Sequence, residues 1–147
     1  MIQELINIGS PWKVLPPGVH IATMEEIKIS FAMTNYRKYL YFGFERAIIS
    51  LRESGCKSVF LDGSFVTTKP IPGDYDICWD TSGVNILLLD PVFLDFTDNR
   101  KEQKKKYYGE FFPANFLADG IVYFLDFFQI DKYTGKPKGI IKINLKK

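Results

Sequence analysis

Two aspartates one residue apart, Asp74 and Asp76, follow a Gly63-Ser64 pair after ten residues. Side chains alternate between the two faces of a strand, so both carboxylates would project from the same face. Neighbouring ionised carboxylates repel each other, and a divalent cation that prefers oxygen ligands removes that cost. The spacing therefore predicts a Mg²⁺ or Mn²⁺ site at Asp74 and Asp76.

The Gly63-Ser64 pair predicts a contact with phosphate. Glycine allows the backbone to approach a ligand closely, and a serine hydroxyl next to backbone amides can bind an anion. The connection to the aspartates adds the hydroxyl of Thr67 and the ammonium group of Lys69. We therefore expect Gly63, Ser64, Thr67 and Lys69 to bind the phosphates of a substrate, with Ser64 as the main contact.

The combination is more specific than either of its parts. An Asp-x-Asp pattern arises by chance in about one of every two or three chains of this length, and a Gly-Ser pair at a fitting distance upstream reduces this to about one chain in a hundred. The alternative is that Gly63-Ser64 is an ordinary turn and that the aspartates are solvated charges on an edge strand.

The surrounding segments predict two strands and two helices that position these residues. Residues 58–62 and 75–79 are short apolar runs that end at turn residues, as buried strands do. From 35 to 54 apolar residues recur every three or four positions, and Gly55 suits a left-handed helix end. A capping box at residues 23–26 opens a shorter helix.

The second half of the chain predicts a further helix and more strands. The basic segment 100–108 is expected to be helical and residues 110–112 to form a short strand. Residues 121–130 are expected to pair with 139–145 across a turn at 133–136, which forms a C-terminal β-hairpin. The class is therefore α+β, with helices early and strands late.

Two segments give less definite predictions. The three prolines of residues 11–18 predict an ordered segment without regular structure. The apolar run 84–89 fits a strand or a helical turn equally well, since a short run has no usable period.

Length and composition predict one folded domain, residues 1–147, in the reducing cytoplasm. Cys56 and Cys78 give no disulfide framework, and with His20 as the sole histidine they cannot complete a four-ligand zinc site. The start lacks a basic region followed by an apolar stretch, which predicts no export. The most apolar run, 86–96, is interrupted by a proline and aspartates, which predicts no membrane span.

Several enzyme classes are disfavoured. A Ser-His-Asp hydrolase or a Cys-His enzyme needs a well-placed histidine, and the chain has only one. A Walker-type ATPase is disfavoured because no Gly-x-x-x-x-Gly-Lys-Ser/Thr sequence occurs. The net charge of +2 is too small to indicate nucleic-acid binding by itself.

Gly63-Ser64 followed by Asp74-Tyr75-Asp76-Ile77 resembles the signature of the nucleotidyltransferase superfamily, which includes DNA polymerase beta, the minimal antitoxin-type nucleotidyltransferases and the aminoglycoside adenylyltransferases. Nearly the whole chain is similar to a family of short, uncharacterised microbial and phage proteins placed in that superfamily. The similar blocks are Leu15-Pro16-Pro17-Gly18, Leu61-Asp62-Gly63-Ser64-Phe65-Val66-Thr67, Pro72-Gly73-Asp74-Tyr75-Asp76, Phe111-Phe112-Pro113-Ala114 and Phe127-Phe128-Gln129.

The resemblance implies a small mixed sheet flanked by helices. It also implies a nucleoside triphosphate substrate, bound with Mg²⁺ or Mn²⁺, whose nucleotide is transferred with release of pyrophosphate. The acceptor is left open among a hydroxyl of RNA, of a protein or of a small molecule.

The superfamily usually has a third carboxylate on a later strand. Glu110 opens the strand after the basic helix and is the expected residue, so Asp74, Asp76 and Glu110 would be the catalytic metal ligands. Asp126 is the rival, because strand alternation would place it on the same face as Phe124 and Phe128. A glutamate at this position, where aspartate is more usual, moves the carboxylate out by one methylene.

Two other functions are consistent with the same residues. One is a catalytically silent module that acts as a protein partner, as an antitoxin does for its toxin. The other is a nucleic-acid binder that uses the basic run 100–106 with Tyr107 and Tyr108, where the alternative is a solvated helix face. A homodimer would supply the acceptor surface that a short chain lacks.

The N-terminal part of the long predicted helix is rich in aromatic residues. We expect these side chains to be core and partner surface rather than a platform for stacking bases. They are Tyr36, Tyr39, Tyr41, Phe42 and Phe44.

Overall fold

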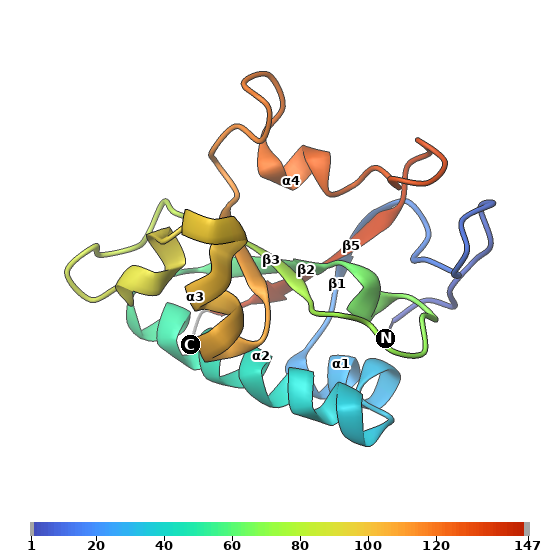
Figure 1. Cartoon of the computed structure of the whole chain (residues 1–147), viewed down its shortest axis with the longest axis horizontal. Coiled ribbons are helices and arrows are strands. Elements are labelled where there is room, and N and C mark those ends of the chain that lie inside the picture. The colour runs from blue at the N-terminus through green and yellow to red at the C-terminus, as the bar shows by residue number, and fades with distance from the viewer. Residues whose placement is uncertain (1, 146–147) are drawn as a thin grey trace.

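The computed structural model describes residues 2–145 and contains one five-stranded mixed sheet in the order β1-β5-β2-β3-β4 (Figure 1). The strands are β1 Gly18–Ile21, β2 Ser58–Asp62, β3 Asp76–Trp79, β4 Glu110–Pro113 and β5 Gly139–Asn144. The helices are α1 Met24–Phe31, α2 Asn35–Glu53, α3 Thr97–Tyr107 and α4 Phe124–Phe127, with short 3₁₀ helices η1 Ser64–Val66 and η2 Pro91–Leu94. This architecture confirms the predicted α+β class.

The central strands are antiparallel and the outer pairs are parallel. β2 pairs with β3 and β5 in antiparallel register, while β1 runs parallel to β5 and β4 runs parallel to β3. No helix of the described part of the chain is both long and apolar enough to cross a membrane.

Alternation along the strands divides the core into two clusters, one on each face of the sheet. Leu61, Ile77 and Phe111 belong to the large cluster on the side of α1 and α2. Their neighbours in sequence face the other side, where α4 lies across the sheet (Figure 1). That smaller cluster contains Phe60, Cys78, Phe112, Ala114 and Ile140 with Phe124, Leu125 and Phe128 packed against it.

The two predicted N-terminal helices are confirmed. Thr23 and Glu26 form the capping box, in which each side chain accepts a hydrogen bond from the backbone N–H of the other residue, at 3.1 and 3.0 Å. Helix α2 ends before Gly55, whose φ of +98° is the left-handed conformation that glycine adopts readily. The helix buries Leu40, Phe44, Ala47, Ile48 and Leu51 beneath the sheet.

The predicted C-terminal hairpin is wrong. Residues 124–127 form the helical turn α4, and no residue of 121–130 pairs with a residue of 139–145; the isolated bridge of Ile130 is to Pro137, which precedes the second predicted arm. Strand β5 instead pairs with β1 and β2. The physical reason is packing. Phe124 and Phe128, which are four residues apart, both contact the ring of Phe112. A helical turn brings two such side chains together, whereas a strand would hold them roughly 13 Å apart.

One smaller prediction is wrong. Strand β1, Gly18–Ile21, begins at the last residue of the proline-rich segment, where no strand was expected.

Two other predictions agree with the structure. Of the strand and the helical turn left open for residues 84–89, the structure has the turn, because the Asn85 carbonyl accepts hydrogen bonds from the N–H groups of Leu88 and Leu89. The basic segment is helical as predicted: residues 98–100 have positive φ, so the regular right-handed helix of α3 begins after Arg100.

Candidate metal and phosphate site

Three carboxylates meet at one end of strands β3 and β4. Asp76 opens β3, Asp74 precedes it by two residues, and Glu110 opens β4 directly opposite Asp76 in the parallel register. One oxygen from each of the three side chains lies within 4.8 Å of the others. The structure therefore brings together the three residues predicted to bind metal.

The cluster fits a divalent cation. Opposite ligands of Mg²⁺ are ~4.2 Å apart at usual Mg–O distances, so small side-chain rotations would bring these oxygens into one coordination sphere. Burial and then the charge of Glu110 raise the pKa of the Asp74 carboxyl to about 6. Burial and the charges of Asp74, Asp62 and Glu110 raise the pKa of Asp76 well above its ordinary value. A bound cation would offset both penalties.

Position 63 favours glycine because its backbone has a positive φ and lies close to Asp76. Its φ is +88°, and a Cβ atom built on it would lie 2.9 Å from Oδ2 of Asp76 and 3.1 Å from the Asp76 backbone nitrogen. Any other residue would be strained at this φ, and its Cβ would require Asp76 to shift. Ser64 follows at the start of η1, so its side chain lines the same cavity as Asp74 and Asp76.

The connection between Gly63-Ser64 and the aspartates is fixed by Arg37 of α2. The buried guanidinium donates hydrogen bonds to the carbonyl oxygens of Phe31, Phe65, Thr67 and Lys69, at distances of 2.6 to 3.1 Å. Three carbonyl groups of the loop and the last carbonyl group of α1 are thereby satisfied by one side chain. This role could not be read from the sequence, because an arginine in an amphipathic helix is usually exposed.

Thr67 positions the turn. Its hydroxyl donates to the Ser64 carbonyl at 2.6 Å and accepts from the Lys69 N–H at 3.1 Å. The side chain lines the cavity as predicted, yet its hydroxyl is already engaged at both ends. We therefore assign Thr67 to holding Ser64 rather than to contacting phosphate.

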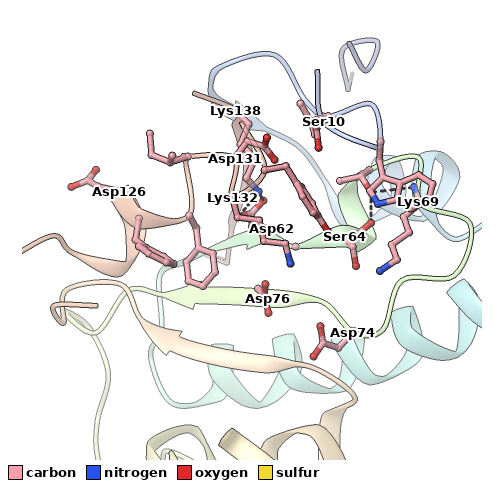
Figure 2. A pocket seen from close by; sticks show the side chains of 18 of the residues that line it. Ser10, Asp62, Ser64, Lys69, Asp74, Asp76, Asp126, Asp131, Lys132 and Lys138 are labelled. Atoms are coloured by element: carbon pink, nitrogen blue, oxygen red, sulfur yellow. Dashed lines mark hydrogen bonds and ion pairs between the residues drawn. The ribbon is translucent and has the colours of Figure 1, made fainter. Parts of the chain in front are cut away.

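Asp74 and Asp76 border a cavity of about 470 Å³, whose lining does not include Glu110 (Figure 2). Ser64 and Lys69 lie on one side of it, and Asp62, Lys132 and Lys138 lie on another. The three lysines supply positive charge within the same cavity as the aspartates. Apolar and aromatic side chains complete the lining, among them Trp12, Val14, Phe127, Phe128 and Tyr133.

Asp62 and Lys138 form a buried ion pair at the cavity. The Lys138 ammonium lies 2.8 and 3.0 Å from the two oxygens of Asp62. Burial raises the pKa of Asp62 to about 6, although Lys138 lowers it. A buried aspartate at the end of an otherwise apolar strand needs a partner, so the involvement of Asp62 could have been inferred from the sequence. Lys138 and Lys132 could not, because they lie in a segment whose fold was predicted incorrectly.

Asp126 is excluded as the third carboxylate. It is exposed on α4, and Figure 2 shows its carboxylate directed away from Asp74 and Asp76. The prediction placed it on the same face as Phe124 and Phe128, but in a helical turn residues four apart share a face and the residue between them points elsewhere.

The basic run 100–106 does not form one continuous charged face. Lys104 lies 2.9 Å from Glu110, and Lys106 pairs with Asp90. The Arg100 guanidinium lies 3.9 Å above the Phe112 ring. Lys101 and Lys105 stay exposed and have no ion-pair partner among residues 2–145.

Comparison with known proteins identifies the family and no function. No curated protein and no solved structure matches the chain. A family model described as a family of unknown function, DUF6932, matches residues 10–144. The matched span contains every residue that lines the cavity, from Ser10 to Lys138, as well as Glu110. The chain therefore belongs to the DUF6932 family.

Proposed function

We propose that the protein is a metal-dependent nucleotidyltransferase that moves a nucleoside monophosphate from a nucleoside triphosphate to an acceptor hydroxyl. The observation that carries this proposal is the meeting of three carboxylates within 4.8 Å of one another, two of which, Asp74 and Asp76, line a cavity that also contains three lysines. The close approach of Gly63 to Asp76 adds support, because it ties the Gly-Ser turn to the metal ligands. The resemblance to the nucleotidyltransferase signature rests on the same residues.

Each residue has a role in this reaction. Asp74, Asp76 and Glu110 would hold Mg²⁺ or Mn²⁺, which when bound neutralises the triphosphate and lowers the pKa of the acceptor hydroxyl. The hydroxyl of Ser64 and the backbone beside Gly63 would bind the phosphates. Lys69 and Lys132 line the cavity and would neutralise further phosphate charge.

The reaction balances without a protein nucleophile. A bond forms between the acceptor oxygen and the α-phosphorus, while the bond from the α-phosphorus to the bridging oxygen of the β-phosphate breaks. Pyrophosphate leaves, and the acceptor proton passes to solvent. This scheme agrees with a cavity whose described lining contains no histidine or cysteine.

A second candidate is a catalytically silent module that binds a partner protein, as antitoxins do. One observation favours it: Glu110 is already engaged in an ion pair with Lys104. Catalysis would require Glu110 to share its charge between this lysine and a metal ion. Metal binding by the intact cluster therefore separates the two candidates.

The test uses nucleoside triphosphates labelled at the α- or the γ-phosphate, with Mg²⁺ or Mn²⁺ and with RNA, protein or small-molecule acceptors. We expect label to be transferred from the α-phosphate only, and transfer to be lost in Asp74→Asn, Asp76→Asn and Glu110→Gln. Asp126→Asn is the matched control, since it removes a carboxylate outside the cluster, and it should retain transfer.

The proposal would be overturned by two results together. One is equal labelling in the wild type and in the three cluster variants. The other is the absence of Mn²⁺ binding in isothermal titration calorimetry, which would leave the silent module as the supported function.

A further inference from the structure

An exposed row of aromatic side chains runs along α2 and onto the end of α3. The row consists of Tyr36, Tyr39, Phe42 and Tyr108, and we refer to it as the aromatic row. The rings of Tyr39 and Tyr108 stack with centroids 4.2 Å apart, and Tyr36 lies next to Tyr39 at 6.4 Å. Tyr39 and Phe42 are 51% and 55% exposed. Tyr36, Tyr39 and Phe42 are thus exposed, whereas Tyr41 and Phe44 of the same segment are buried in the core.

The fold holds Tyr108 in the row at a conformational cost. Its φ is +68°, a conformation that favours glycine, and it caps the C-terminus of α3. Helix α2 approaches this point so closely that a Cβ atom on Gly43 would lie 2.2 Å from the Tyr107 carbonyl oxygen. Arg46 lies over the rings of both Phe42 and Tyr108. The Tyr108 ring, which is partly buried against the core, is thus fixed in one position.

Lysines accompany the row on both helices. Lys105 and Lys101 lie three and seven residues before Tyr108, in the helix that Tyr108 caps. Lys38 lies one turn before Phe42 on α2. All three are exposed and have no ion pair among residues 2–145.

This combination of residues distinguishes between kinds of partner. Lysine is depleted at protein interfaces, where tyrosine and arginine are enriched. Aromatic rings beside unpaired cations are typical of surfaces that bind single-stranded nucleic acid, because bases stack on the rings and phosphates contact the cations. The charges therefore favour a nucleic acid over a protein.

The aromatic row also adjoins the candidate metal site. The Tyr36 hydroxyl donates to the carbonyl of Gly73 at 3.2 Å, and Gly73 directly precedes Asp74. On the side of α3, the backbone N–H of Tyr108 donates a hydrogen bond to the carbonyl oxygen of Lys104. The ammonium group of Lys104 lies 2.9 Å from a carboxylate oxygen of Glu110. A strand that lies on the row would have one end beside the carboxylates.

We propose that the aromatic row binds single-stranded nucleic acid and presents a terminal hydroxyl of that strand as the acceptor. The acceptor role rests on the proposed function, whereas the binding of the strand does not.

The test is fluorescence anisotropy with a 5′-labelled oligouridylate of twelve nucleotides, in EDTA and at low salt. We expect Tyr39→Ala and Tyr108→Gly each to weaken binding by about tenfold, since base stacking on one ring contributes an effect of this order. Tyr108→Gly suits the backbone conformation, so the fold should be retained, and thermal melting checks this. Tyr123→Ala, which removes an exposed ring at the N-cap of α4 outside the row, is the matched control and should bind as the wild type does.

The lysines have their own readout. Replacing Lys101 and Lys105 together by alanine should reduce the slope of log affinity against log salt concentration by about 1.4. The pair Lys28→Ala and Lys57→Ala, exposed lysines away from the row, should leave the slope unchanged.

Each outcome bears on one proposal or the other. Binding that is lost in the row variants but retained in Asp74→Asn supports the nucleic-acid surface even if no nucleotide is transferred. Nucleotide transfer to another acceptor, with no binding of the oligonucleotide, overturns the surface and leaves the proposed function intact. If Tyr108→Gly instead splits an oligomer in analytical ultracentrifugation and the oligonucleotide does not bind, the row is a protein interface and the inference is wrong.

Discussion

Two regions enclose the cavity, and they are built differently. The floor, which we define as β2, β3, β4 and the loop 63–75, is tightly constrained: every residue of β2 is buried, and Arg37 fixes the loop through three of its carbonyl oxygens. The strap, residues 114–138, contains one helix of four residues, none of them buried, and two isolated bridges. Many local contacts hold the floor and few hold the strap. The floor is therefore suited to fixed metal ligands, and the strap to adapting to a substrate.

The largest expected effect comes from cutting the ion pair that links the two regions. Lys138→Met leaves the Asp62 carboxylate buried without a cation, so we expect a loss of about 3–5 kcal/mol in the free energy of unfolding. Chemical denaturation measures it. Lys136→Met removes an exposed strap lysine and is the matched control. Adding Asp62→Asn to Lys138→Met should recover much of the loss; a loss below about 1 kcal/mol in the single variant would show that the strap is not tied to the floor there.

A smaller effect is expected within the floor itself. In Gly63→Ala the new methyl group would meet Asp76 in a backbone conformation that disfavours alanine, so we expect a loss of about 2 kcal/mol. Mn²⁺ affinity in calorimetry should fall by about tenfold, because Asp76 must move. Gly120→Ala, at φ +85° with no atom near its Cβ position, separates strain from collision. Equal Mn²⁺ affinity in both variants would contradict the close-approach argument.

The strap alone should matter less for stability. Phe128 is half-buried on Phe112, so Phe128→Ala should cost about 1–2 kcal/mol and leave Mn²⁺ affinity unchanged. Phe111→Ala, in the fully buried floor, should cost about 3–5 kcal/mol. Similar losses in the two variants would remove the distinction between strap and floor.

The smallest effect expected is a dependence on pH. The folded pKa of Asp74 is raised to about 6 from an ordinary value near 3.8, so the metal-free folded state binds a proton more tightly than the unfolded state does. Stability should therefore rise as the pH falls from 7 towards 5. Thermal melting in EDTA should show this rise, and Asp74→Asn should reduce it. Saturating Mg²⁺ should reverse the trend, because a metal ion needs ionised ligands. Falling stability over this range in EDTA would contradict it.

The difference between floor and strap also explains which elements could be predicted from the sequence. The limits of β2 and α2 and the capping box at Thr23 follow from local patterns of apolar residues and caps, which the structure confirms. The prediction for the strap was wrong because the spacing of Phe124 and Phe128 fits a strand or a helical turn, and only their packing on Phe112 selects the helical turn. Strand β1 was not predicted because it depends on a partner strand more than a hundred residues away in the chain.

The candidate site was predictable to the extent that its residues are close in sequence. Gly63, Ser64, Asp74 and Asp76 were identified from their spacing, whereas Glu110 was expected only because the resemblance implies a third carboxylate on a later strand. Arg37, Lys132 and Lys138 could not be found, because their roles depend on where a distant helix and the strap come to lie. Long-range contacts leave no periodic signal in the sequence.

The position of β5 in the sheet has a consequence for folding. β5 lies between β1 and β2, yet it follows both of them by more than seventy residues in the chain. During synthesis, β1 and one edge of β2 therefore have no partner until residue 139 and those after it have been made. Contacts of such long range make folding slow and leave strand edges exposed meanwhile. We expect the nascent chain to need protection from aggregation until β5 closes the sheet.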